Sequence, residues 1–271
     1  MRLYKLELSK ISSRKFTWVI SGMWFAMIVF VSCQEVGMAE RVLVEFGQAA
    51  GYRRFPFLIQ LLICFTIVWL SVVLSPMFCE DRQIKTDVLI LTSVNGRFAD
   101  YVARLGVVFT LVISSFVFVL LLTYGICYAL YGYVGNGFTA EDIFLLEKYA
   151  PALAKADVET YNTYYLLRVI SALMMLAGII VWISARCSKT VNALVATLIV
   201  VLCPLMTEGF FMAGSIGDFI CSGQPMILIV ETRFWFNYEM YGGHILLAYL
   251  VVVIGIICGG RNWCQDRRKK Q

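Results

Sequence analysis

Long runs of apolar residues, separated by short polar segments, make up most of this chain. Six runs are long enough to cross a bilayer as helices, given about 20 residues for each crossing. They are Phe16–Cys33, Pro56–Phe78, Leu105–Val134, Tyr164–Ala185, Val191–Ala213 and Tyr241–Gly260. Backbone polar groups in lipid must be bonded within the protein, so we expect an all-α membrane protein with six transmembrane helices. Residues 1–271 are predicted to form a single transmembrane domain.

The composition supports this pattern. Of the 271 residues, 60% are hydrophobic and 15% are charged, whereas a soluble domain is nearer half apolar and a quarter charged. The first run follows Arg14 and Lys15, as in a signal peptide, but no A-x-A cleavage site follows it. We therefore expect an uncleaved first span. The third run is longer than one crossing needs, which indicates tilt or extension beyond the lipid.

The distribution of Lys and Arg predicts the orientation of the spans. With the N-terminus inside, the inner segments and their flanks carry sixteen of these residues and the outer segments carry six. Cytoplasmic loops are enriched in Lys and Arg, so both termini should lie in the cytoplasm of a multi-pass cell-membrane protein. The basic residues gather at the chain ends and between apolar runs, which suits anionic lipid rather than nucleic acid.

Two outer segments have a distinct character. The segment Gly135–Thr163 is acidic and should form a short exposed helix followed by a loop. The segment Gly214–Met240 contains an apolar stretch, Pro225–Val230, that is too short to span a membrane. Aromatic residues follow this stretch, as they often do at a membrane surface, so we expect a re-entrant or interfacial segment before the last span.

The inner segment between spans two and three carries the most information. Charged residues open it at Glu80, Asp81 and Arg82, and apolar residues then recur at helical spacing from Val88. Asn95–Gly96 is a helix stop signal. This pattern predicts a short amphipathic helix against the inner membrane surface. The helix is either a connector that anchors the bundle or a docking element for a cytoplasmic partner.

The same segment resembles the inner loop of ABC-2-type transporter permeases. That family usually has Glu after span two, Thr about six residues later, a Leu-rich turn, a small-residue stop with Arg, and a basic residue opening span three. The matching positions here are Glu80, Thr86, Leu89, Leu91, Thr92-Ser93, Gly96-Arg97 and Arg104. The segment Leu6–Lys10 is similar to the amphipathic segment before span one. The chain departs from the pattern at Lys85, where Gly is usual, and at Val94-Asn95, where Pro is usual.

The resemblance implies a coupling helix that sits in a groove on a separate ATPase subunit. The docking residues would be Glu80, Asp81, Arg82, Thr86, Leu89, Leu91 and Arg97, with charges setting the register and apolar side chains adding affinity. This chain has no G-x-x-x-x-G-K-[ST] phosphate loop, so the ATPase must be another chain. A second permease subunit, identical or related, would complete the translocation path.

The spans contain few other polar candidates. Glu208 lies four residues after Pro204, whose ring should kink span five. Carboxylates at membrane depth are costly and often functional. Glu208 is therefore either part of a translocation path or a solvated residue at the interface. Gln60 in span two is a second candidate for the path, or a hydrogen-bond partner between helices.

No catalytic or metal-binding arrangement is apparent in the sequence. The nine cysteines include no C-x-x-C pair and the chain has one histidine, so we expect neither a zinc site nor a cofactor. Cys33 and Cys221 could pair on the outer side, or serve as small packing residues. No activated serine or paired carboxylate indicates an enzyme.

These observations predict the transmembrane subunit of an ABC exporter that moves an amphipathic substrate such as a peptide, an antibiotic or a lipid-like molecule. The substrate class follows from the family resemblance. The alternative is a non-transporting membrane protein, such as an immunity or sensor subunit, that binds a ligand at its outer loops.

Overall fold

The computed structural model describes residues 2–47, 50–84, 96–132, 158–207 and 238–265. These residues are almost entirely helical and contain no strand. The helices are α1 (Arg2–Ser13), α2 (Lys15–Phe46), α3 (Ala50–Leu74), α4 (Cys79–Ile84), α6 (Gly96–Tyr131), α9 (Val158–Arg186), α10 (Thr190–Thr207) and α13 (Tyr238–Gln265).

Five helical segments of the described chain are long and apolar enough to cross a membrane. They are Lys15–Phe46, Ala50–Asp81, Gly96–Tyr131, Tyr165–Arg186 and Leu246–Cys264. Five of the six predicted spans fall on these segments, which makes the chain a multi-pass helical membrane protein. The predicted fifth span, Val191–Ala213, overlaps α10, whose apolar part is shorter. Residues 208–213 lie outside the described residues, so the sixth crossing stays a prediction.

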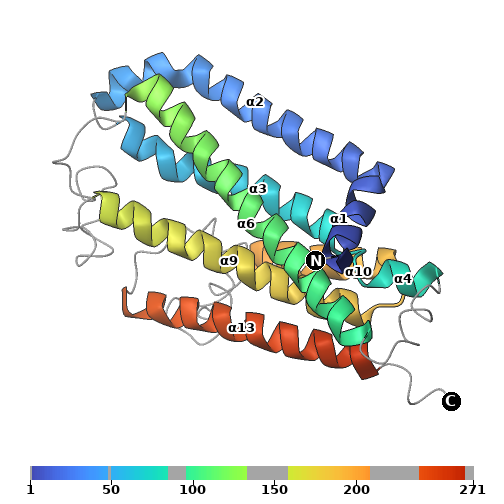
Figure 1. Ribbon diagram of the computed structural model, residues 1–271. Coiled ribbons are helices and arrows are strands. Elements are labelled where there is room, and N and C mark those ends of the chain that lie inside the picture. The colour runs from blue at the N-terminus through green and yellow to red at the C-terminus, as the bar shows by residue number, and fades with distance from the viewer. Residues whose placement is uncertain (1, 48–49, 85–95, 133–157, 208–237, 266–271) are drawn as a thin grey trace.

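The long helices lie side by side in one bundle (Figure 1). In this view α2 forms one edge and α13 the opposite edge, with α3, α6 and α9 between them. The helices α1 and α4 and the C-terminal end of α13 gather at one end. We call this the α1 end of the bundle. The first described helix and the last residues of α13 therefore lie at the same end of the bundle.

Helix α2 is longer than its apolar run. The run ends at Cys33, but the helix continues to Phe46, and α3 starts only four residues later. At 1.5 Å for each residue, its 32 residues extend about 48 Å, which exceeds the ~30 Å of lipid hydrocarbon. Gly47 ends it with a φ of 54°, a left-handed conformation that glycine adopts without strain. The predicted outer connection between Cys33 and Pro56 is therefore mostly helical.

Helix α3 forms the centre of the apolar core. Many of its side chains are fully buried, among them Leu58, Leu62, Ile63, Ile67 and Leu70. Helix α2, by contrast, exposes most of its apolar side chains outside the bundle, where lipid is their natural solvent. The bundle thus has a packed centre and an apolar outer surface.

Helices α9 and α13 cross at glycines. A Cβ added to Gly255 would lie 2.4 Å from the carbonyl oxygen of Gly178, and one added to Gly259 would lie 2.9 Å from a methyl group of Val181. Gly255 and Gly259 form a G-x-x-x-G pair, which lets helix backbones approach closely in membranes. This pair was not among the residues predicted from the sequence, although its spacing is visible there.

Candidate functional site

A fully buried arginine lies at the centre of the α1 end. Arg104 of α6 has no exposed surface. Its Nε donates to Asp100 Oδ2 at 2.9 Å, one helical turn earlier. Its two Nη groups donate to Asp81 and to the backbone carbonyl of Met77, and Nη2 lies 3.7 Å from Glu7 Oε1. A charge buried this deeply is tolerated because several acceptors replace its water.

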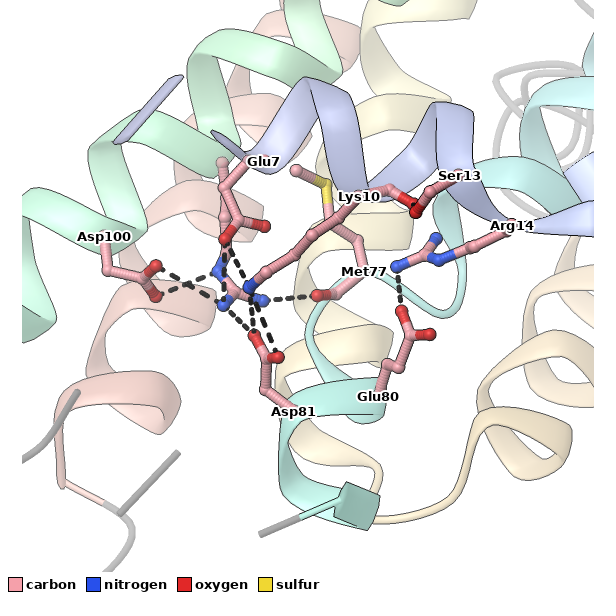
Figure 2. A network of polar contacts seen from close by, with 9 residues as sticks. Glu7, Lys10, Ser13, Arg14, Met77, Glu80, Asp81 and Asp100 are labelled. Carbon is pink, nitrogen blue, oxygen red and sulfur yellow. Dashed lines mark hydrogen bonds and ion pairs between the residues drawn. The ribbon is translucent and has the colours of Figure 1, made fainter. Parts of the chain in front are cut away.

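A lysine from α1 joins the same group. Lys10 Nζ lies 2.7 Å from Glu7 Oε1 and 3.4 Å from both carboxylate oxygens of Asp81. Glu7 and Asp81 therefore each contact both cations, as Figure 2 shows for the carboxylates around Lys10. We call Glu7, Lys10, Asp81, Asp100 and Arg104 the ionic cluster. It joins α1, α4 and α6 although these segments are far apart in the sequence.

Two aromatic rings complete the environment of the guanidinium. Its Cζ lies 4.8 Å from the ring centroid of Trp263 and 5.4 Å from that of Phe78. The two rings meet edge to face at 5.4 Å. Contact with an aromatic face stabilises a desolvated cation by about 0.5–2 kcal/mol. Trp263 belongs to α13, so the last helix also contacts the cluster.

The turn between α3 and α4 is held by α9. We call residues 75–78 the elbow. The hydroxyl of Ser184 donates to the Ser75 carbonyl at 2.7 Å and accepts from the backbone N–H of Phe78 at 3.1 Å. The Cys79 thiol donates to the Ser184 carbonyl at 3.1 Å. These bonds fix the direction in which the chain leaves α3, and so bring the first turn of α4 beneath α1.

A second ion pair lies beside the cluster. Arg14, the non-helical residue between α1 and α2, forms an ion pair with Glu80 (Figure 2). The two side chains are 15% and 33% exposed, so this pair is nearer to solvent than the cluster. Arg97 at the start of α6 donates to the carbonyl of Cys264 at 2.8 Å. A cation there satisfies a carbonyl of the last helical turn of α13.

Three of the predicted docking residues, Glu80, Asp81 and Arg97, have partners within the chain. Asp81 is buried in the ionic cluster, Glu80 pairs with Arg14, and Arg97 contacts α13. Arg82 lies in α4. The other predicted docking residues, Thr86, Leu89 and Leu91, lie outside the described residues, as does Glu208 of the predicted path. Gln60 is half-buried on α3. The docking and path roles of all these residues stay predictions.

Four members of the ionic cluster, all except Asp81, were not predicted as site residues from the sequence. Glu7 and Lys10 are three residues apart, and Asp100 and Arg104 are four apart. Both spacings put the two side chains on one helical face. This spacing is the signal that was available, but it also occurs at solvated helix surfaces. Only the packing of α1 against α6 distinguishes the two cases.

A separate polar group lies at the opposite end of α2. Arg54 contacts both carboxylate oxygens of Glu35, with Nε to Oε1 at 2.7 Å and Nη2 to Oε2 at 2.5 Å. Tyr131 also donates to this carboxylate, which is 2% exposed. Polar contacts thus join α2, α3 and α6 here, as the ionic cluster joins α1, α4 and α6 at the other end. Within the described residues, no set of His, Cys, Asp and Glu side chains is arranged to hold a metal.

Comparisons of this chain with protein-family models, with curated proteins and with solved structures gave no match. Its function must therefore be argued from its own residues. Among the described residues, the polar groups at the α1 end join α1, α4 and α6.

Proposed function

We propose that this chain is the transmembrane permease subunit of an ATP-driven ABC exporter. The observation that carries the proposal is the segment 80–97, which matches the coupling-loop pattern and begins directly at the ionic cluster. A partner that pushes on this segment would act on α3 through the elbow and on α6 through its first turn. Arg104 of α6 bonds both the elbow and α4, so the end of α3 and α6 would move together.

The proposed orientation has the α1 end in the cytoplasm. The excess of Lys and Arg on the inner segments supports it. A cytoplasmic ATPase subunit would bind the segment 80–97, and a second permease subunit would complete the path for an amphipathic substrate. Glu208 and Gln60 are the candidate residues of that path.

The central experiment tests whether the segment binds an ATPase. The subunit is purified in mild detergent from its native cells, and the proteins that copurify with it are searched for a phosphate-loop ATPase. Replacing Leu89 and Leu91 together by Asp puts two charges where an apolar docking surface is proposed, at a cost of several kcal/mol. The double variant should insert normally in the membrane and lose its ATPase.

A matched control shows whether the ATPase is lost because apolar contact is removed or because charge is added. Gln83→Asp with Ser93→Asp adds the same two charges at polar positions of the same segment, and this variant should retain its ATPase. A charge reversal at Glu80 is a weaker test of docking, because it also breaks the ion pair with Arg14.

Two results would count against the proposal. If the Leu89/Leu91 variant keeps its ATPase at the wild-type level, the segment is not the principal docking site. If even the wild-type subunit copurifies with no ATPase, the exporter function is refuted. In that event the alternative, an immunity or sensor protein that binds a ligand at its outer loops, becomes the better hypothesis.

A further inference from the structure

Helix α1 is attached to the bundle through charged as well as apolar side chains. Its leucines at positions 3, 6 and 8 are exposed, whereas Glu7 is buried. Ile11 is buried and Tyr4 packs against the core, while the polar contacts of α1 include the ion pairs of Glu7 and Lys10 and a hydrogen bond from Tyr4 to Thr110 at 3.1 Å. Ion pairs and hydrogen bonds depend on direction more than apolar packing does. The orientation of α1 therefore depends in part on where its charged partners lie.

Those partners include the two acidic residues of the first turn of α4. Lys10 lies 3.4 Å from Asp81, and Arg14 pairs with the neighbouring Glu80. The two cations are four residues apart along the chain, so α4 is held at two points. A single ion pair leaves two helices free to rotate about it, whereas two adjacent pairs fix their relative orientation.

One of the two contacts is at the hinge between α1 and α2. Arg14 has an extended backbone, with φ −73° and ψ 117°, and interrupts an otherwise continuous helical segment. Only one residue separates the last residue of α1, Ser13, from the first of α2, Lys15. A displacement of Glu80 therefore acts directly on the point where α2 begins.

We propose that α1 is a lever: Lys10 and Arg14 are positioning residues that carry a displacement of α4 to the α1–α2 hinge, and so to the first transmembrane helix. This inference rests on the proposed function, because the displacement of α4 comes from the ATPase. The lever would give the ATPase a second way to move the transmembrane helices, besides its action on α3 and α6. The substrate path would then respond on the side of α2 as well.

The test uses charge reversal and exchange. The variants are Arg14→Glu, Glu80→Arg and the double variant that swaps the two charges. Hydrogen exchange of peptide 2–14 is measured on the full-length subunit in lipid nanodiscs, without any ATPase. Each single variant should raise the exchange rate by about tenfold, because it breaks the pair and sets like charges together. The swapped variant should return to within about threefold of wild type.

Lys15→Glu is the matched control. It makes the same change of charge one residue further on, at an exposed side chain. Its exchange should equal that of wild type. If the single variants exchange like this control, or if the swap restores nothing, the contact between Arg14 and Glu80 does not hold α1 and the lever is refuted.

A second measurement tests whether the Arg14–Glu80 pair transmits a displacement of α4 to α2 or only attaches α1 to the bundle. With the ATPase bound, the amount of substrate moved for each ATP hydrolysed should fall several-fold in Arg14→Glu and recover in the swap. Arg14 lies outside the proposed docking segment, so Arg14→Glu should bind the ATPase as wild type does. Recovery of exchange without recovery of this ratio would show that the pair only holds the fold, which overturns the lever. Absence of ATPase from the wild-type complex would instead refute the proposed function, while the exchange data would still decide whether the pair holds α1.

Discussion

Replacing Arg104 by Met should destabilise the protein strongly. The guanidinium has no exposed surface and contacts carboxylates from three segments. Met has a similar length and leaves no large cavity, so the variant mainly removes charge. Asp81, Asp100 and Glu7 would then share Lys10 as the remaining cation of the cluster. Removing one partner of a buried ion pair costs about 3–5 kcal/mol, and we expect a value in that range.

Two further variants show why Arg104→Met is expected to destabilise the protein. Arg97→Met removes a cation from the same helix, one that donates to a backbone carbonyl. A hydrogen bond to a charged group contributes about 1.5–3 kcal/mol, so this variant should cost less than Arg104→Met. Adding Asp81→Asn and Asp100→Asn to Arg104→Met neutralises the two carboxylates left unpaired. More than half of the lost stability should return, because the penalty comes from uncompensated charge.

The measurement is reversible unfolding in mixed detergent micelles, followed by tryptophan fluorescence. The free energy of unfolding is compared for wild type and the three variants under one set of conditions. If Arg104→Met costs no more than Arg97→Met, the ionic cluster is not what holds the α1 end together. If the neutralised variant is no more stable than Arg104→Met alone, buried charge is not the reason for the loss.

Two other predictions concern packing and orientation. Gly255→Ala should lower the free energy of unfolding by about 1–3 kcal/mol, because the new Cβ meets the backbone of α9 and the two helices must separate. In the same assay, Gly22→Ala should be neutral or slightly stabilising, because its new Cβ meets no atom within 4 Å. Cysteines placed in 135–163 should react with an impermeant thiol reagent on intact cells, whereas cysteines in 80–97 should not; reaction of the latter would reverse the proposed orientation.

The helices themselves were largely predictable. Five apolar runs became membrane-length helices because a backbone in lipid has no other way to bond its polar groups. The ends of the helices were less predictable. The sequence analysis ended span one at Cys33, where the apolar run stops, but helix formation depends on backbone bonding and continues to Phe46. The polar part of α2 is stabilised by contacts such as that of Glu35 with Arg54, which no local pattern reveals.

The ionic cluster was beyond the reach of sequence reasoning for a related reason. Asp81 was predicted as a charge at the rim of a docking surface, because acidic residues of a polar segment are usually solvated. In the structure Asp81 accepts a hydrogen bond from Arg104, which lies 23 positions later. From the sequence, Arg104 was predicted only to be the basic residue that opens span three. Which carboxylate meets which cation depends on how α1, α4 and α6 pack. The helical spacing of residues shows which side chains share one face of a helix, but it does not show which other helix that face packs against.

Pairing of charges also bears on the orientation, because a cation held by carboxylates interacts less with anionic lipid than a free one. At least three of the sixteen basic residues assigned to the inner side, Lys10, Arg14 and Arg104, have such partners. On the outer side, at least one of the six, Arg54, is paired in the same way. Setting aside these ion pairs of the described residues leaves thirteen basic residues on the inner side and five on the outer side, so the asymmetry that predicts a cytoplasmic α1 end survives these pairs. The inner excess rests on the remaining cations near the ends of the spans, where the positive-inside rule applies.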